Sequence, residues 1–310
     1  MGELAGLVAA MIWAGTSIAF TRFAGRTAPA VISALRLGSA SLVLPLILLA
    51  SGEAGDLEAA SWQTLAWVVL SGALAYAVGD TLYIRALSLI GMQRTFPITM
   101  GLFIALTVVG GIVLLDEDFT WGLPVGAALI AIGISLIVVP RAEDGPPEPA
   151  PGEGDLVAAD PPGPPPWRGS LAGYVLLVLV GIFWAAASLV LAGKRGDLGA
   201  IAAGSIRAPA GAVALLGFTA ALQPKELAAP FRDRRHLGGI VLAGLLGTGI
   251  GSMLYVYAVL EAGPGKAAVL SATAPLMALP LSILFLKERP TRLIAAGTLL
   301  CVAGIVLVVR

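Results

Sequence analysis

Charged side chains are scarce in this chain. Only 12% of the 310 residues are charged, and 19 basic residues balance 19 acidic ones. A nucleic-acid-binding protein would need a basic face, and a soluble enzyme of this size would need about twice the charge to cover its surface. A disordered chain would need low hydrophobicity, whereas 58% of these residues are hydrophobic. These absences leave an integral membrane protein that binds no nucleic acid.

Cysteine and histidine are equally rare. The one cysteine, Cys301, excludes a disulfide framework and a cysteine-based metal site. The one histidine, His236, lies in a basic loop, which excludes a Ser–His pair or an HExxH zinc site within the membrane. The chain also has no P-loop for ATP. We therefore predict no catalytic residue, no metal, no cofactor and no enzymatic activity.

Long apolar runs are abundant instead. A helix needs about 20 apolar residues to cross the hydrocarbon core of a bilayer. The sequence holds ten such runs, so the predicted fold is an all-α integral membrane protein with ten transmembrane helices. Only Glu3 precedes the first run and no small-residue cleavage site follows it, so we interpret that run as a retained helix. The predicted spans are 4–20, 28–50, 64–86, 95–115, 121–140, 169–192, 199–222, 237–260, 267–286 and 293–309.

A proline-rich segment divides the chain at its midpoint. Residues 140–167 hold ten of the 21 prolines and more acids than bases, so they cannot form a buried helix. We predict a first five-helix unit at 1–140, a disordered acidic linker at 141–168 and a second five-helix unit at 169–310.

The two units repeat each other. At an offset of 171, Trp13, Ser17 and Arg36 correspond to Trp184, Ser188 and Arg207, and at an offset of 172 Gly79 and Tyr83 correspond to Gly251 and Tyr255. Because each unit has an odd number of spans, the second unit must enter the membrane inverted. Inverted repeats build alternating-access transporters, whose substrate site lies near the midplane between the repeats.

Short motifs occur along the chain, and the first two of them recur in the same order in both units. They are IWAGTS at 12–17 with FWAAAS at 183–188, SALR at 33–36 with SIR at 205–207, ATAPL at 272–276, and LKER at 286–289. Together they resemble the EamA family of the drug/metabolite transporter superfamily over essentially the whole chain outside the linker. The resemblance implies a multi-pass exporter of small solutes in the plasma or inner membrane, with cytoplasmic termini.

Four charged residues fall inside the predicted spans: Arg36, Asp80, Arg85 and Arg207. An intramembrane charge is a functional-site hypothesis by default. The two repeat-related arginines either bind an anionic solute group or bind backbone carbonyls as scaffold. Asp80 has no acidic counterpart, since Ser252 stands at the matched position. Asp80 either pairs with an arginine or binds a proton or a cationic solute. Arg85 is near a helix end, where it could extend to the interface.

Aromatic and hydroxyl side chains complete the predicted cavity. Tyrosine and tryptophan combine apolar area with one polar tip, which suits either a cavity lining or core packing. The candidates are Trp13, Ser17, Tyr83, Trp184, Ser188, Tyr255 and Tyr257.

The predicted function is secondary transport of small organic metabolites, such as amino acids, by alternating access between the repeats. The three intramembrane arginines against one aspartate favour solutes with an anionic group. The alternatives are an exporter of cationic drugs, a membrane-embedded enzyme and a non-transporting scaffold. The partners are the solute and the bilayer; a homo-oligomer is compatible with the sequence, but one chain suffices for a complete pore.

The orientation has two conflicting indications. The odd-numbered loops hold 12 basic residues, against four in the even-numbered loops and termini. The positive-inside rule then places the odd-numbered loops in the cytoplasm and both termini outside, opposite to the family resemblance.

Overall fold

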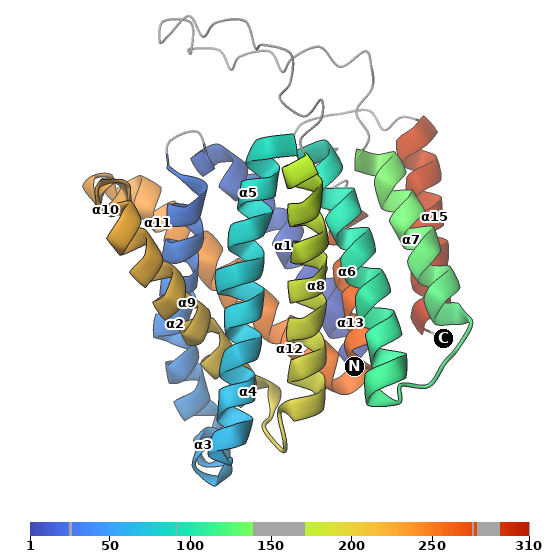
Figure 1. Ribbon diagram of the computed structural model, residues 1–310, viewed down its shortest axis with the longest axis horizontal. Helices are drawn as coiled ribbons and strands as arrows, with labels where there is room; N and C mark the ends of the chain where they lie inside the picture. Colours follow the sequence, from blue (N-terminus) through green and yellow to red (C-terminus); the bar gives the residue numbers. More distant parts are fainter. Residues whose placement is uncertain (25–26, 91, 139–170, 275, 278–291, 310) are drawn as a thin grey trace, which may run out of the picture.

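The computed structural model is a bundle of helices, with no strand among the residues it describes (Figure 1). It describes residues 1–24, 27–90, 92–138, 171–274, 276–277 and 292–309. The predicted linker 141–168 and half of the predicted ninth span, 267–286, lie outside these residues.

The first part of the chain forms α1 (Gly2–Ala24), α2 (Pro29–Ser51), α3 (Ala54–Ala59), α4 (Trp62–Gly72), the π-helical η1 (Ala73–Gly79), α5 (Asp80–Ile90), α6 (Met92–Leu115) and α7 (Gly122–Val138). The second part forms α8 (Leu171–Lys194), α9 (Ala200–Leu222), α10 (Pro224–Ala228), η2 (Ala229–Arg232), α11 (Arg234–Gly244), the π-helical η3 (Leu245–Gly251), α12 (Ser252–Ala262), α13 (Pro264–Ser271) and α15 (Arg292–Val309).

Among the residues that the structure describes, six helical stretches are long and apolar enough to cross a membrane. Three shorter apolar stretches in the same described ranges, Gly2–Thr16, Gly122–Leu136 and Ala295–Val309, overlap further predicted spans. Large apolar side chains cover the outside of the bundle; Leu42, Val213 and Leu299 are 76%, 75% and 70% exposed. Such a surface suits lipid tails and not water. The prediction of an all-helical membrane protein is confirmed.

Helices at matched positions of the two units pack reciprocally. Helix α1 packs on α12 and α13, whereas its counterpart α8 packs on α5 and α6. The two remaining pairs pack on each other, α2 on α9 and α7 on α15. Glycines allow the last pair to approach closely, because a Cβ atom on Gly126 would lie 2.7 Å from the Gly304 carbonyl oxygen, and the reverse distance is the same.

A π-helical turn interrupts the third span of each unit at the same place. The segments η1 and η3 start and end 172 residues apart. A π turn closes with i→i+5 hydrogen bonds, and such turns concentrate at functional sites. In these two, the N–H of Asp80 donates to the Ala75 carbonyl and the N–H of Ser252 donates to the Gly247 carbonyl.

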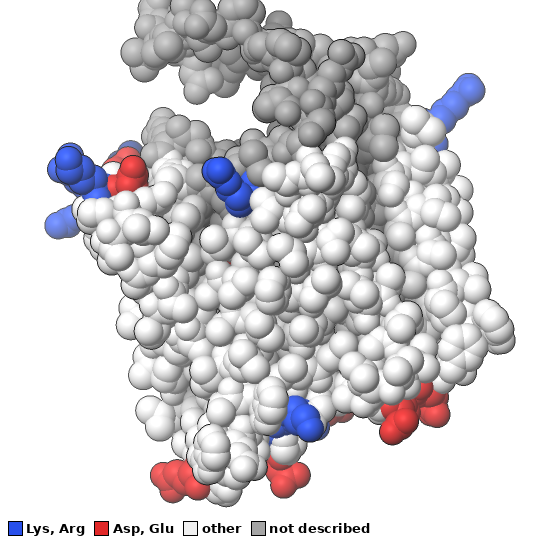
Figure 2. Space-filling view, in the orientation of Figure 1, with Lys and Arg blue, Asp and Glu red and all other residues white. Residues whose placement is uncertain are grey.

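The two ends of the bundle differ in charge. Basic side chains lie over the end formed by α10, α11 and the start of α15, whereas acidic ones dominate the end formed by α3 and the α6–α7 loop (Figure 2). The N-terminus and the end of α15 lie at the acidic end (Figure 1).

This charge distribution predicts that the chain's termini face away from the cytoplasm. Alkaline phosphatase fused to the C-terminus should therefore be active on the outer side of the membrane, and a fused green fluorescent protein should stay dark. A fluorescent fusion with inactive phosphatase would reject the charge-based orientation and support the orientation that the family resemblance implies.

Candidate functional site

Two tryptophans connect the units through the π-helical turns. The Trp13 indole N–H donates to the Gly247 carbonyl at 2.9 Å, and the Trp184 indole N–H donates to the Ala75 carbonyl at 3.2 Å. Each of these carbonyls also accepts the backbone bond that closes its π turn. The widened turn thus presents a carbonyl to an indole from the other unit, which satisfies an N–H that the interior would otherwise leave unpaired.

Each indole also lies against a tyrosine and a glycine of the opposite unit. The ring centroids of Trp13 and Tyr255 are 5.6 Å apart, and those of Trp184 and Tyr83 are 5.2 Å apart. A Cβ atom on Gly251 would lie 2.8 Å from the Trp13 Nε1 atom, and one on Gly79 would lie 2.5 Å from the Trp184 Cδ1 atom. The absence of a side chain at these two positions is what lets the rings sit on the π-helical segments.

The third-span helices also approach the arginine-bearing helices across the units. A Cβ atom on Gly72 would overlap the backbone of Arg207, and one on Gly244 would lie 2.8 Å from the Arg36 carbonyl oxygen. The predicted doubled residues, Trp13 with Trp184 and Arg36 with Arg207, therefore lie at matched contacts.

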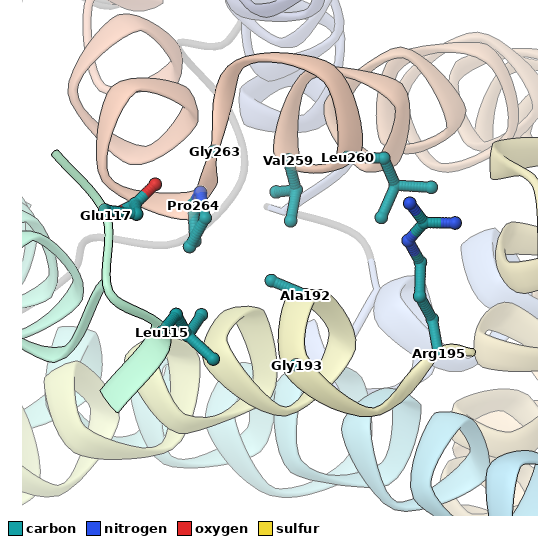
Figure 3. A pocket seen from close by; sticks show the side chains of 9 residues that line it. All are labelled: Leu115, Glu117, Ala192, Gly193, Arg195, Val259, Leu260, Gly263 and Pro264. Carbon is teal, nitrogen blue, oxygen red and sulfur yellow. The ribbon is translucent and has the colours of Figure 1, made fainter. Parts of the chain in front are cut away.

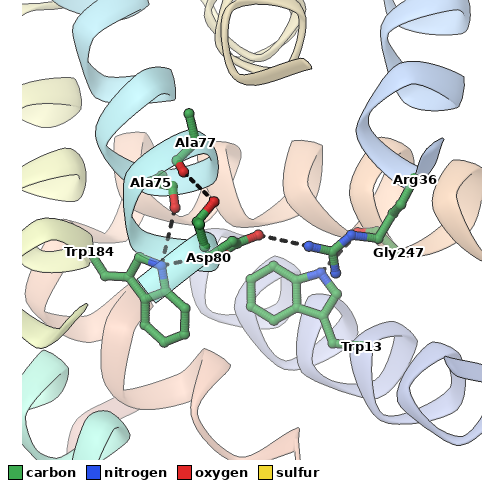
Figure 4. A network of polar contacts seen from close by, with 8 residues as sticks. Trp13, Arg36, Ala75, Ala77, Asp80, Trp184 and Gly247 are labelled. Carbon is green, nitrogen blue, oxygen red and sulfur yellow. Dashed lines mark hydrogen bonds and ion pairs between the residues drawn. The ribbon is translucent and has the colours of Figure 1, made fainter. Parts of the chain in front are cut away.

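Asp80 is the centre of a polar network (Figure 4). Its Oδ2 atom lies 2.7 Å from Nη2 of Arg36, and its Oδ1 atom accepts the Trp184 indole N–H at 3.2 Å. The Arg36 and Asp80 side chains are only 26% and 17% exposed. Of the three arginines considered as partners of Asp80, the structure therefore selects Arg36. The ion pair carries no net charge, and the attraction between its two charges offsets part of the free-energy cost of burying each of them.

Arg207 has different surroundings from its counterpart. Its guanidinium lies 5.5 Å from the centroid of the Tyr76 ring, and the residue is 2% exposed. The Nε and Nη1 atoms are buried and have no hydrogen-bond partner among the described residues. Sequence comparison missed Tyr76, because Thr248 stands at the matched position and breaks the repeat signal there.

The other predicted site residues are divided. The hydroxyls of Ser188 and Tyr255 lie 2.8 Å apart, next to the Trp13 ring. Tyr257 is 36% exposed and is not brought into this cluster. Arg85 is exposed on α5. Ser17 belongs to α1, but its side chain is outside what the structure describes.

A groove lies at the acidic end of the bundle, where α6, α8 and α12 end (Figure 3). Its volume is about 290 Å³, and Glu117, Arg195, Gly263 and Pro264 are among its lining residues. None of the predicted site residues lines it.

Glu117 connects the two units at this groove. Its carboxylate lies against Gly263, which has a φ of 87°, and faces the first turn of α13. Side chains at Gly263 would be excluded both by this φ and by overlap with the carboxylate. Burial raises the pKa of Glu117, while the N–H of Gly265 and the charge of Lys266 lower it by less.

Metal chemistry has no candidate centre in the described ranges. No three histidine, cysteine, aspartate or glutamate side chains there are arranged to hold a metal ion. Within the described part of the chain, the arginine–aspartate–tryptophan network is the charged constellation that the predictions and the structure share.

Comparison with known proteins agrees with this architecture. The model of the EamA-like transporter family matches the chain twice, at residues 1–139 and 171–310. The chain belongs to the EamA-like transporter family. Membership makes it a multi-pass membrane protein of a transporter family, with a small-molecule solute and a lipid environment, and it confirms the resemblance found in the motifs.

Two individual matches were also found. An "Uncharacterized transporter in sor 3'region" of Acidianus ambivalens is 33% identical over 78 residues, which are 25% of this chain and 31% of that protein. The match thus spans about a third of the relative's length. A crystal structure is similar in fold, with a TM-score of 0.78 and 17% identity over 99% of this chain and 94% of the other.

The indole–glycine contacts predict a contrast between two glycines of η3. Gly251→Ala should destabilise this EamA-like protein by about 1–3 kcal/mol, because the added methyl group would collide with Trp13. Gly249→Ala is the matched control, since no atom lies within 4 Å of its Cβ position, and it should leave stability unchanged or raise it. Thermal unfolding of the purified variants measures both. Equal losses would show that the π-helical segment tolerates no side chain, independently of the indole.

Glu117 predicts a pH-dependent stability difference. Its pKa is raised in the folded protein by burial, so its contribution is fully present at low pH and is lost as pH rises through the folded-state value. Glu117→Gln keeps the shape but does not ionise. The melting temperature of the wild type should therefore fall relative to this variant between about pH 4 and pH 7. If the melting temperature of the wild type instead rises relative to that of the variant over this range, the raised pKa of Glu117 is contradicted.

Proposed function

We propose that this chain is a secondary transporter that exports small organic metabolites, such as amino acids, by alternating access. In this proposal ten spans form two inverted five-helix repeats, 1–140 and 169–310, connected by the linker 141–168. The observation that carries it is the reciprocal seating of Trp13 and Trp184 on the π-helical turns of the opposite unit. Reciprocal contacts of this kind define a two-fold interface, here between two parts of one chain.

The solute site of this proposal lies at that interface. The Arg36–Asp80 pair and the two indoles place polar groups in the middle of apolar helices, where a transporter of inverted repeats holds its solute. Each π turn ends at Asp80 or its counterpart Ser252, so a change in the turn would move the polar groups directly. Rocking of one unit against the other would expose the site to each side in turn.

Two features favour a metabolite over a cationic drug. Asp80 is already neutralised by Arg36, so it does not offer an uncompensated negative charge to a cation. Arg207, by contrast, is a buried cation. The direction of transport and the plasma-membrane location follow the family analogy, and a single chain contains both halves of the proposed pore.

The test is solute efflux from proteoliposomes that contain the purified protein. Vesicles loaded with labelled amino acids should release at least one of them faster than protein-free vesicles. Gly251→Ala provides an inactive or weakened comparison, and Gly249→Ala a matched active one. If the folded protein releases no solute across a broad panel of amino acids and other metabolites, the transport proposal fails.

Asp80 is the proton-coupling candidate, since its protonation would cancel the charge that holds Arg36. Asp80→Asn should remove the pH dependence of efflux. Because this variant leaves the Arg36 charge without its carboxylate, the double variant Asp80→Asn with Arg36→Gln serves as a control for folding. Efflux that keeps its wild-type pH dependence in a folded Asp80→Asn protein would exclude Asp80 from proton coupling.

A further inference from the structure

Among the described residues, the charges inside the predicted spans do not balance. Of the four charges inside the predicted spans, Arg36 and Asp80 form an ion pair at 2.7 Å. Arg85 is exposed on α5. Arg207 is therefore left as one net positive charge in the interior. An uncompensated buried charge is strongly unfavourable, so a structure that keeps one has a use for it.

The surroundings of Arg207 offer it little compensation. The residue is 2% exposed, and its Nε and Nη1 atoms are buried with no acceptor among the described residues. The Tyr76 ring, 5.5 Å from the guanidinium carbon, attracts the cation through its π face but accepts no strong hydrogen bond. Donors of a charged guanidinium normally bind carboxylates or phosphates.

The internal repeat indicates which kind of group Arg207 lacks compared with Arg36. Arg36 and Asp80 of the first unit correspond to Arg207 and Ser252 of the second. Helix α9 packs against α12 in the second unit, as α2 packs against α5 in the first. Ser252 is 8% exposed and, like Asp80, follows directly on a π-helical turn. Where the first unit supplies a carboxylate, the second supplies a short, neutral hydroxyl.

We infer that Arg207 binds a singly charged carboxylate of the transported solute, at the position in the second unit that corresponds to the Asp80 carboxylate in the first. This inference rests on the proposed transport function and names the class of solute. A carboxylate would complete the symmetry of the network from outside the chain.

Charge counting favours a monoanion. One carboxylate bound to Arg207 would bring the summed charge of Arg36, Asp80 and Arg207 to zero. A doubly charged phosphate would leave one negative charge in a low-dielectric interior, which is as unfavourable as the positive charge it replaces. The expected solutes are therefore monocarboxylates or zwitterions whose carboxylate meets Arg207.

Binding is tested with benzoate, with benzamide as its neutral isostere and with inorganic phosphate at pH 8 as the dianion. Benzoate should raise the melting temperature of the purified protein by several degrees, increasing with concentration, since a ligand that binds only the folded state stabilises it. Benzamide and phosphate should have little effect. An equal response to benzamide, or a larger one to phosphate, would overturn the inference.

Two variants locate the site. Arg207→Gln should weaken the benzoate response by on the order of tenfold or more, because charge-assisted hydrogen bonds are lost. Arg292→Gln, which removes an exposed arginine at the start of α15, should respond as the wild type does. A benzoate response that survives in Arg207→Gln would overturn the inference.

The most specific test keeps Arg207 and replaces Ser252, the counterpart of Asp80. Ser252→Asp should supply an internal carboxylate, raise the melting temperature without ligand, and abolish the benzoate response. Ser252→Asn, of nearly equal size but neutral, should keep the response. This pair also covers the case in which Arg207→Gln fails to fold. An unchanged benzoate response in Ser252→Asp would reject the assigned position.

The failure of the carboxylate site and the failure of the transport proposal give different results. Solute efflux from proteoliposomes without any benzoate response would overturn the carboxylate site and leave transport standing. A benzoate response that depends on Arg207, in a protein that moves no solute, would support the site and overturn the transporter.

Discussion

The interior of this protein depends on one requirement, that indole N–H groups and charges placed between apolar helices find partners within the chain. Two π-helical turns meet this requirement for the two indole N–H groups. Each turn brings out a carbonyl, Ala75 in η1 and Gly247 in η3, which accepts both its own backbone bond and an indole from the other unit. The glycines at the ends of the turns give the rings room.

The reciprocal contacts extend from these turns to the whole bundle. Helix α1 packs on α12 and α13 as α8 packs on α5 and α6, and the self-matched pairs α2–α9 and α7–α15 close the arrangement. Two of the places where the symmetry is broken change the chemistry of the site. Asp80 is matched by Ser252 and Tyr76 by Thr248. These differences make the two halves of the site unequal, with one arginine paired and the other buried beside an aromatic ring.

Much of the architecture could be predicted, because it follows from local hydrophobicity or from a pattern that occurs in both units. Apolar runs gave the helices, since burial in lipid requires them whatever their neighbours are. The repeat register identified Trp13 and Trp184 as counterparts, and in the structure they make matched contacts. Tyr76 was missed because it has no counterpart in the repeat, and its contact with Arg207 joins residues far apart in sequence. The π-helical turns also left no sequence signal, although both contain glycine at matched positions.

The sequence by itself determined the membrane class, the helical fold, the twofold internal repeat and the short set of intramembrane charges, because composition and periodicity follow from burial in lipid. Only the tertiary structure decided which arginine pairs with Asp80. Three arginines were equivalent candidates along the chain, and an ion pair depends on distances of a few ångströms between helices, which no linear pattern specifies. It also decided that Arg207 keeps its charge without an internal carboxylate among the described residues.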